Sequence, residues 1–396
     1  MPYVDSKFPQ IITESFPLLK NLHVAFSDSN INEKRRERMA DLMTGKFEYK
    51  QLADKYANFI VPTVRIKVNG LDVIKMKGFI VSELDMRLAV EEASSVRMKF
   101  AHAYDIQSHS FSSEIKDTFQ LGSIVEVELG YLSTTEHLFK GYVEMLGVEM
   151  GKEDLFVVTL MDAKRLMMNS GKKNILYTEK NYSDVFKKIM GNYANVCSVS
   201  IDTTNDNLEN PISQMSNDYD FVMTELIGRG KVNREFIILA GKAYFQKPKK
   251  VTTPIIKMRY GRELIDLSVS HCYKDLMVQV IGVDDKQNVI SGQAEAKGEL
   301  SQKKVMSQTP IFMIADPHAD TKDKAATKAE AVARQEKEKS CIGRGSTIGI
   351  PEIVPGRYLE IENMDSMLDK KYYITEVMHH YTRESYTTHF EIGGCV

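Results

Sequence analysis

Between residues 62 and 162, six or more strand-like segments follow one another, and they constrain the fold more than any other feature of the sequence. The first, TVRIKVNG, places Val64, Ile66 and Val68 on one face, because alternate residues of a strand point the same way. Its Asn-Gly pair is a strong hairpin signal. Short turns and no helical pattern separate the segments, which is typical of a β-sandwich or barrel.

The following stretch, residues 165–250, predicts a small α+β domain. NYSDVFKKIMGNY predicts a helix that begins at a Ser183 cap and buries one apolar stripe, formed by Val185, Phe186, Ile189 and Met190. SNDYDFVMTELIGRGK predicts a second helix, capped by Asn217 or Asp218 and ended by Gly228 or Gly230. Its expected buried side is Tyr219, Val222, Met223, Leu226 and Ile227. REFIILAGKAYFQKP then predicts two strands joined by a Gly-Lys turn.

Strand patterns resume in PIIKMRYGRELIDLSVS and KDLMVQVIGVDD and return near the end in GRYLEIENM, KKYYITEVMHHYT and SYTTHFEIG. Residues 291–345 lie between them and are rich in Ala, Lys, Glu and Gln. This stretch predicts a helical connector whose apolar stripe is only Ala and Val. We therefore expect a second β domain over 251–396 that is interrupted by 291–345.

Residues 1–60 predict a helical N-terminal extension. INEKRRERMADLMTGK indicates one charged helix, ended by Gly45, and FEYKQLADKYANF indicates a second. Neither has a wide apolar face, so such helices are expected to lie on another surface, of this chain or of a neighbour. A loosely ordered arm is the other interpretation of so polar a stretch.

Charge and composition exclude several classes of protein. The net charge is −2 and the basic residues are scattered, whereas a nucleic-acid binder usually shows a basic face. No apolar run reaches the roughly 18 residues that span a bilayer, and the first residues do not have the order of a secretory signal, so we expect synthesis in the cytoplasm and no stable membrane association. The four cysteines lie far apart without a CxxC pair, which disfavours a zinc module or a disulfide framework.

The final segment, YYITEVMHHYTRESYTTHFEIGGCV, contains His379, His380 and His389 and raises the question of a metal site. Adjacent strand residues point to opposite faces, so at most one of the first two histidines can join His389. A two-residue turn at 384–385 would set His380 opposite His389, and a three-residue turn would set His379 there. The sequence leaves the register open. A catalytic zinc needs three protein ligands, so we expect ordinary cross-strand histidines and no metal.

Other motifs also indicate no catalytic chemistry. GRGSTIG, at 343–349, follows a helical pattern and precedes a proline, whereas phosphate loops lie between a strand and a helix; we expect a loop there. No GxSxG nucleophile elbow occurs. The acidic pairs at 91–92 and 284–285 are expected to be solvated turn or strand-end residues. The sequence thus predicts a structural protein, not an enzyme, with no catalytic, cofactor-binding or metal-binding residues.

The order of the motifs resembles a known family. SIVEVELGY followed by HLFKGYVEML resembles the first barrel of the late-control D family, the hub proteins of contractile phage tails and related injection systems. NYSDVFKKIMGNY, ISQMSNDYDFVMTELIGRG and AGKAYFQKP resemble its middle domain, where a Gln-Xaa-Ser/Asn-Asp-Tyr-Asp-Phe stretch opens a helix. RYGRELIDLSVS, the alanine-rich helix, PGRYLEI and YYITEVMHHYT with SYTTHFEIGG resemble its closing barrel. The resemblance covers residues 61–396 and leaves 1–60 unassigned.

The resemblance implies an α+β, mainly β fold. It consists of two tail-tube-like β-barrels, at 61–164 and 251–396, with a small α+β domain inserted at 165–250 and a helical extension at 1–60. It further implies a structural baseplate hub, a homotrimer that joins a hexameric inner tube to a trimeric spike. Related type VI secretion spike proteins continue into an oligonucleotide-binding-type domain and a needle, so we expect the spike to be a separate protein here.

The implied partners are the spike protein, the inner tube proteins and the baseplate wedge proteins, with no nucleic acid. The protein is expected in a phage tail or contractile injection particle. The alternative from a different class is a metal-dependent or cell-wall hydrolase that uses the C-terminal histidines. A free-standing carbohydrate-binding β protein is a third possibility.

Overall fold

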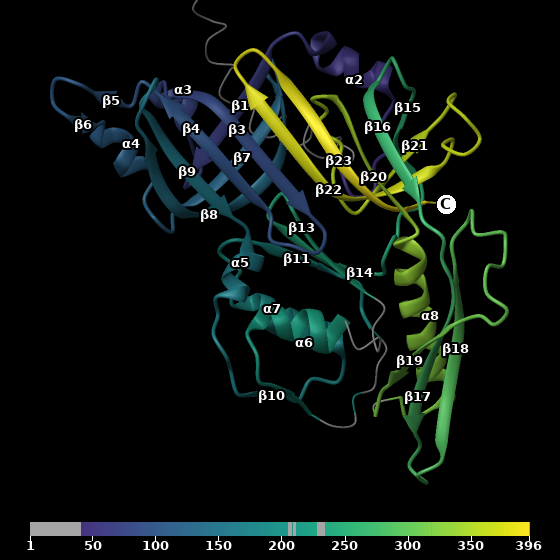
Figure 1. The fold of residues 1–396 in the computed structure, drawn as a ribbon. Helices are drawn as coiled ribbons and strands as arrows, with labels where there is room; N and C mark the ends of the chain where they lie inside the picture. The colour runs from purple at the N-terminus through teal and green to yellow at the C-terminus, as the bar shows by residue number, and fades with distance from the viewer. Residues whose placement is uncertain (1–40, 205–207, 209–210, 228–233, 318, 396) are drawn as a thin grey trace, which may run out of the picture. The chain divides into compact units, whose positions relative to one another are not determined.

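The computed structural model describes residues 41–395 except 205–207, 209–210, 228–233 and 318 (Figure 1). The chain divides into two units, residues 1–41 and 42–396, and the described helices and strands belong to the second. Strands predominate, so the fold is α+β and mainly β, as the sequence predicted. The helix predicted over 31–46 lies mostly outside the described residues.

A large sheet of 13 strands contains both predicted β regions. From the first region come β1 (Pro62–Val68), β2 (Leu71–Asp72), β3 (Ile80–Ala89), β4 (Ser95–Ala101), β7 (Ile124–Tyr131), β8 (Thr134–Glu149) and β9 (Leu155–Met161). Short elements between them are α3 (Val73–Lys77), β5 (Tyr104–Asp105), β6 (Ser110–Phe111) and α4 (Ser113–Thr118). The predicted hairpin turn is confirmed: Asn69 and Gly70 both have positive φ, and Val68 pairs with Leu71.

The second region adds β15 (Pro254–Met258), β16 (Leu264–His271), β20 (Cys341–Ile348), β21 (Tyr358–Ile361), β22 (Lys371–Thr382) and β23 (Tyr386–Cys395). The sheet order is β16-β20-β23-β22-β3-β4-β9-β8-β7-β1-β2, with β21 paired to both β15 and β22. Residues 343–349, expected to be a loop, are mostly strand β20, so that expectation was wrong. Glycine permits the close packing there: a Cβ on Gly345 would lie 2.6 Å from the Phe390 ring.

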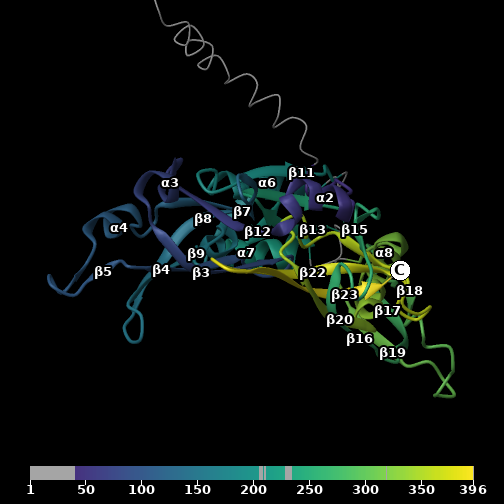
Figure 2. The same ribbon diagram turned by 90° about the horizontal axis from the view of Figure 1, so that it is seen from above.

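Antiparallel pairing of β3 with β22 joins the two regions into one sheet, from Glu83 opposite Thr382 to Ala89 opposite Glu376. In Figures 1 and 2 the yellow C-terminal strand β22 lies beside the blue strand β3 of the first region, and β23 lies on the other side of β22. Side chains of both regions share the largest apolar core of the described residues, to which Leu84, Val127 and Phe390 belong. The sequence patterns did not predict this junction, because strand pairing between distant segments has no local signal.

Residues 42–59 pack onto this core. They contain α2 (Tyr49–Lys55) and a 3₁₀ turn, η1 (Ala57–Phe59). The helix is thinly apolar, as predicted, because Leu52 is its one buried residue. Met43, Leu52 and Tyr56 are nevertheless at most 2% exposed. This part of the predicted extension therefore uses the surface of its own chain and needs no neighbour.

The middle segment has a core of its own. It comprises α5 (Ala163–Met168), β10 (Ile175–Tyr177), α6 (Tyr182–Gly191), β11 (Ser198–Ile201), β12 (Ile212–Gln214), α7 (Asp218–Asp220), the π-helical turn η2 (Phe221–Ile227), β13 (Glu235–Leu239) and β14 (Lys242–Gln246). The predicted stripe of α6 is buried, and Val222 and Leu226 are buried as expected. Phe221, not predicted, is also buried, because the wider π turn changes the residues that face the core.

Two local predictions in this segment were wrong in detail. Asn181 precedes α6 as its cap residue, whereas Ser183 lies inside the first turn, where its Oγ accepts a hydrogen bond from the Thr204 amide at 3.2 Å. The β13–β14 turn is formed by Ala240 and Gly241, both with positive φ, one residue earlier than the predicted Gly-Lys pair.

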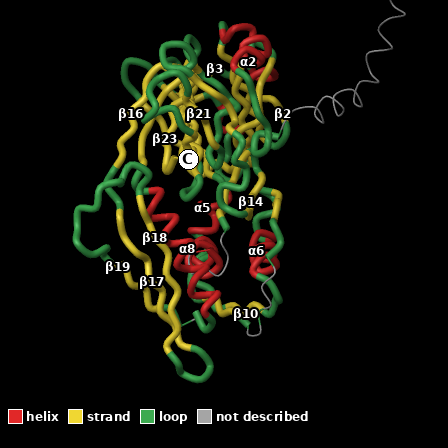
Figure 3. The backbone as a smooth tube through the Cα atoms, turned by 90° about the vertical axis from the view of Figure 1, so that its right-hand side faces the viewer, coloured by secondary structure: helices red, strands yellow, loops and turns green. Residues whose placement is uncertain are grey.

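An insert leaves the large sheet after β16 and returns at β20. It consists of β17 (Asp275–Val283), β18 (Val289–Lys297), β19 (Ile311–Ala315) and α8 (Lys322–Glu338). KDLMVQVIGVDD thus forms β17 of a separate three-stranded sheet and not a strand of the large one. Figure 3 shows α8 alongside β17 and β18. Its alanine stripe is confirmed as the packing face, with Ala325, Ala329 and Ala333 buried.

Candidate functional site

The terminal histidines do not come together. Tyr381 pairs with Tyr386, and the Thr382 amide donates to the Ser385 carbonyl at 2.8 Å, so the hairpin turn is Arg383-Glu384, one residue earlier than expected. His389 consequently lies opposite Met378. Both registers considered from the sequence were wrong. The turn position is set by side-chain bonds such as that of Thr382 Oγ1, which accepts from the Ser385 amide at 3.0 Å.

His379 is fully buried and points into the core between the two β regions. Its Nδ1 lies 3.1 Å from Thr388 Oγ1 and 2.9 Å from the Tyr386 hydroxyl. Burial lowers the pKa of His379 to about 3, so the ring is neutral at physiological pH. This histidine is a buried core residue and is not exposed to a substrate.

His380 lies on the opposite face, with Glu83 and Asp85 of β3, and donor atoms of the three lie within 4.8 Å of one another. Each group already has a protein partner. His380 Nδ1 is 2.6 Å from Asp85 Oδ1, and Lys99 Nζ is 3.1 Å from Glu83 Oε2. The arrangement serves as a cross-strand ion-pair ladder on the β3–β22 junction.

The Gln-Xaa-Ser-Asn-Asp-Tyr-Asp-Phe stretch contains the centre of a buried hydrogen-bond network in the middle segment. Asp218 is fully buried and accepts hydrogen bonds from Lys173 Nζ at 2.5 Å, the Tyr193 hydroxyl at 2.5 Å and Gln214 Nε2 at 2.8 Å. Asn217 caps the helix, since its side chain accepts from the Asp220 amide at 2.7 Å. These hydrogen bonds connect the start of α7 to Lys173 and Tyr193 of the middle segment. The motif therefore has a structural role.

A second buried charged pair joins the middle segment to the large sheet. Asp162 Oδ2 accepts from the Ser94 amide at 3.0 Å, while Lys164 Nζ donates to the Val90 carbonyl at 2.5 Å. Burial raises the pKa of Asp162 to about 6 and lowers that of Lys164 to about 8. Perturbed pairs of this kind occur in active sites and in structural networks. Here both side chains are at most 1% exposed and bond to main chain, so the pair is structural.

The N-terminal helix is anchored by charge as well as by packing. Lys55 forms ion pairs with Glu136 of β8 and, at 2.7 Å, with Glu352 beyond β20, and the Tyr56 hydroxyl donates to Glu352 at 2.8 Å. Burial by itself would lower the pKa of Lys55, but the two carboxylates outweigh it and raise that pKa. Arg357, fully buried, donates to the Leu42 carbonyl and, at 2.6 Å, to that of Gly45.

The acidic pairs are turn residues, as expected. Asp284 accepts from the Lys286 and Asn288 amides, at 2.9 and 2.7 Å, and these bonds contribute to lowering its pKa, with the Asn288 side chain the largest cause. Glu91 and Glu92 lie in the exposed turn after β3, where the Glu91 carbonyl accepts from the Tyr219 hydroxyl.

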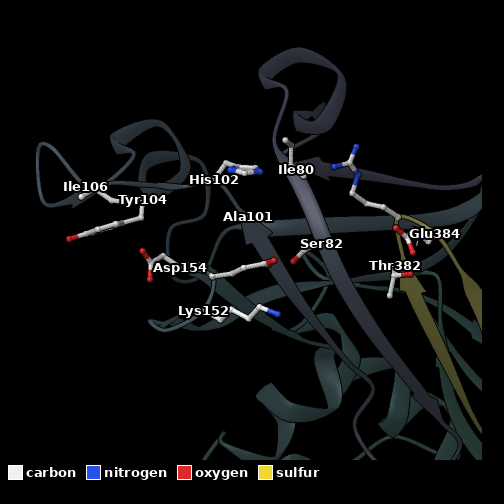
Figure 4. Close-up of a pocket in the computed structure, with 12 residues that line it drawn as sticks. Ile80, Ser82, Ala101, His102, Tyr104, Ile106, Lys152, Asp154, Thr382 and Glu384 are labelled. Atoms are coloured by element: carbon white, nitrogen blue, oxygen red, sulfur yellow. Dashed lines mark hydrogen bonds between the residues drawn. The ribbon is translucent and has the colours of Figure 1, made fainter.

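A surface hollow of about 650 Å³ lies at strand ends of both β regions (Figure 4). Its lining comes from β3, the β4–β5 connection, the β8–β9 turn and the β22–β23 turn. Those residues are Ile80, Ser82, Ala101, His102, Tyr104, Ile106, Lys152, Glu153, Asp154, Thr382, Arg383 and Glu384. Charges of both signs are mixed along an open rim, which suits a polar protein contact better than the enclosed apolar pocket of a small-molecule site.

The structure also assembles a cluster that the sequence patterns do not predict. His271, Cys341 and Cys395, from three neighbouring strands, have donor atoms within 4.8 Å of one another. The wide spacing of the cysteines along the chain disfavours a metal module when the sequence is considered alone. Only the strand order of the large sheet brings them to one place.

A family model described as the Alg8 N-terminal domain matches residues 59–383. The chain belongs to the Alg8 N-terminal domain family. The match begins at the end of the anchored helical segment and includes the first β region, the middle segment, the insert and the second β region as far as β22. It therefore covers most of the described fold.

Solved structures share the fold of this Alg8 N-terminal domain. A tail protein from Neisseria meningitidis is 10% identical, with a TM-score of 0.64 over 84% of this chain and 97% of that one. The 43 kDa tail protein of prophage MuSo2 from Shewanella oneidensis is 10% identical, with a TM-score of 0.62 over 84% and 98%. A component of the type VI secretion system of E. coli is 12% identical, with a TM-score of 0.54 over 83% and 76%.

A curated relative matches only part of the chain. An uncharacterized protein of Methanocaldococcus jannaschii is 36% identical over 85 residues, which is 20% of this chain and 27% of that protein. The chain therefore spans about a quarter of the length of that relative. Separately, none of the helices within the described residues is long and apolar enough to cross a membrane.

Proposed function

We propose that the protein is a structural hub of a phage tail or contractile injection system, which joins a hexameric inner tube to a trimeric spike. The observation that carries the proposal is the single large sheet, in which β3 and β22 join two β regions around an inserted α+β unit. The tail proteins from Neisseria and Shewanella share this fold over 84% of the chain. Fold alone does not establish function, so the proposal requires a direct test.

The symmetries of the inner tube and of the spike are the reason for proposing a trimer. We assign residues 61–164 and 251–396 to two tube-like units, with residues 165–250 between them, as in the late-control D family. Three chains with two such units each present six similar units to a hexameric tube, and the complex keeps the threefold symmetry of a spike. One chain type thereby matches two different symmetries at its two ends.

The partners follow from the same geometry. They are two further copies of the chain, the inner tube protein, a separate spike protein and the baseplate wedge proteins. The E. coli structure is that of a type VI secretion component, which supports a place in such a particle. We propose that residues 1–40 of the N-terminal extension, which lie outside the described residues, contact a neighbouring chain.

The hydrolase alternative loses support from the terminal hairpin. His379 is buried, His380 is paired with Asp85 and His389 is exposed opposite Met378, so the three histidines do not form one site. The stabilising roles found for Asp218 and Lys164 also agree with a scaffold. We accordingly assign the protein no catalytic residue.

The test is the mass of the assembled complex. The full chain should be produced alone, with its spike protein and with both spike and tube proteins from neighbouring genes, and each sample measured by light scattering and native mass spectrometry. We expect a trimer, formed at the latest when the spike is present. A chain that stays monomeric at micromolar concentration with both partners added would refute the hub role.

A further inference from the structure

Three donor side chains meet where the chain leaves the large sheet for the insert. His271 is the last residue of β16, and Cys341, the first residue of β20, is its register partner. Cys395 is the last residue of β23, the strand on the other side of β20. One donor atom from each lies within 4.8 Å of the others. The three residues thus form one cluster across the ends of three adjacent strands.

One nitrogen of the cluster lacks a hydrogen-bond partner among the described residues, and a cavity lies beside the two thiols. His271 Nε2 is buried and has no hydrogen-bond partner among the described residues. A buried imidazole nitrogen without a partner is costly unless something else binds it. Cys341 and Cys395 also line a cavity of about 190 Å³, which provides a route for a small ion. Both thiols are free, and Cys341 is 2% exposed.

A carboxylate lies next to the three donors, although it is not one of the cluster as it stands. Glu299, which follows β18 in the insert, accepts a hydrogen bond from Cys395 Sγ at 3.3 Å. Its other oxygen is held by Lys370 Nζ at 2.7 Å. An outer partner of this kind orients a ligating carboxylate and is a common feature of metal sites.

We propose that His271, Cys341 and Cys395 bind a zinc ion and that the Glu299 side chain turns toward the ion as its fourth ligand. Two thiolates, one imidazole and one carboxylate are donors of the type and number that Zn²⁺ prefers, whereas Mg²⁺ and Ca²⁺ prefer oxygen ligands. The ion and its ligands carry a net charge of −1, which the Lys370 ammonium balances. Binding displaces the two thiol protons to solvent, so uptake is stronger at higher pH.

The site would connect two parts of the fold. Glu299 belongs to the insert, whereas the cysteines and the histidine belong to strands of the large sheet. A bound ion would therefore link the insert to the large sheet at the point where the chain leaves the sheet and returns to it. At this point the Cys272 amide donates to the Ser340 carbonyl at 2.8 Å. The zinc site is independent of the proposed hub role, because it belongs to the isolated chain.

The experiment uses the full, reduced chain with Zn²⁺ and Co²⁺ as probes. Zinc affinity is measured by competition with a chromophoric chelator, and bound metal by elemental analysis after dialysis. Cobalt reports the ligands, because thiolate coordination produces a charge-transfer absorption that oxygen and nitrogen ligands lack. The variants are Cys395→Ser, which is partly exposed and least disruptive, and His271→Gln. Cys272→Ser is the matched control: it is exposed, adjacent to His271 and outside the cluster.

We expect one zinc per chain and a thiolate-to-cobalt band in the wild type and in Cys272→Ser. Cys395→Ser and His271→Gln should weaken zinc binding at least about 100-fold, and Lys370→Met about 10-fold, as for loss of a ligand and of an outer partner. Substoichiometric zinc in the reduced wild type would overturn the proposal. So would equal affinity in wild type and Cys395→Ser, or a Cys341–Cys395 disulfide that forms in preference to the metal complex.

Discussion

Replacement of Asp218 by alanine should loosen the middle segment selectively. The change removes the acceptor of three hydrogen bonds, from Lys173, Tyr193 and Gln214, inside a fully buried site. Hydrogen bonds to a charged group contribute roughly 1.5–3 kcal/mol each and do not add, while truncation of one member of a buried ion pair costs about 3–5 kcal/mol. Lys173 is 24% exposed, so water can solvate its freed charge in part. We therefore expect a loss of about 3 kcal/mol.

The measurement must be local, because a chain with several cores has no single free energy of unfolding. Hydrogen exchange of α6 and of the β13–β14 hairpin reports the opening free energy of the middle segment, and β8–β9 serves as an internal reference. Asp220→Ala is the matched control. Its side chain is exposed and accepts one bond, from Asn217 Nδ2 at 2.7 Å, so it should cost less than about 1 kcal/mol.

A double-mutant cycle with Lys173→Met sharpens the test. If the ion pair contributes as described, Asp218→Ala should cost less in the Lys173→Met background than in the wild type, since no unpaired ammonium remains. Equal losses of α6 protection in Asp218→Ala and Asp220→Ala would contradict the role of the buried acceptor. A rise of exchange in β8–β9 as large as that in α6 would contradict the local nature of the effect.

Three further changes test other parts of the structure. Because burial lowers the pKa of His379 to about 3, below the ~6.5 of an unfolded chain, stability present above pH 6.5 is lost as pH falls toward 3. Hydrogen exchange of β22 and β23 at pH 7 and pH 5 should show that the protection of the wild type exceeds that of His379→Gln by about 2 kcal/mol less at pH 5 than at pH 7. A difference that does not change with pH contradicts the assignment. Arg357→Met removes the donors to the Leu42 and Gly45 carbonyls, so amide protection in α2 should fall by at least about 1 kcal/mol while α6 is unchanged. His389→Ala, at an exposed strand position, should alter stability by less than about 0.5 kcal/mol and leave the zinc content unchanged. Loss of zinc in that variant would mean that the terminal histidines bind the metal.

Elements with local signals were predictable from the sequence. Alternation over residues 63–68 predicted β1, and the Asn-Gly pair predicted its turn, because both depend on the backbone geometry of a few neighbouring residues. The apolar stripe of α6 and the alanine stripe of α8 were likewise readable from helical spacing. The mainly β class followed from these segments together.

The meeting of distant segments, in contrast, depends on the folded chain as a whole. The paired strands β3 and β22 are almost 300 residues apart in the sequence. The turn of the terminal hairpin lies one residue earlier than a register that would pair His380 with His389, so these histidines do not meet. The same sheet order brought Cys341 and Cys395 to His271, although their spacing in sequence argued against a metal module. Strand register depends on packing and turn hydrogen bonds over the whole fold, so a site formed across strands has no signature along the chain.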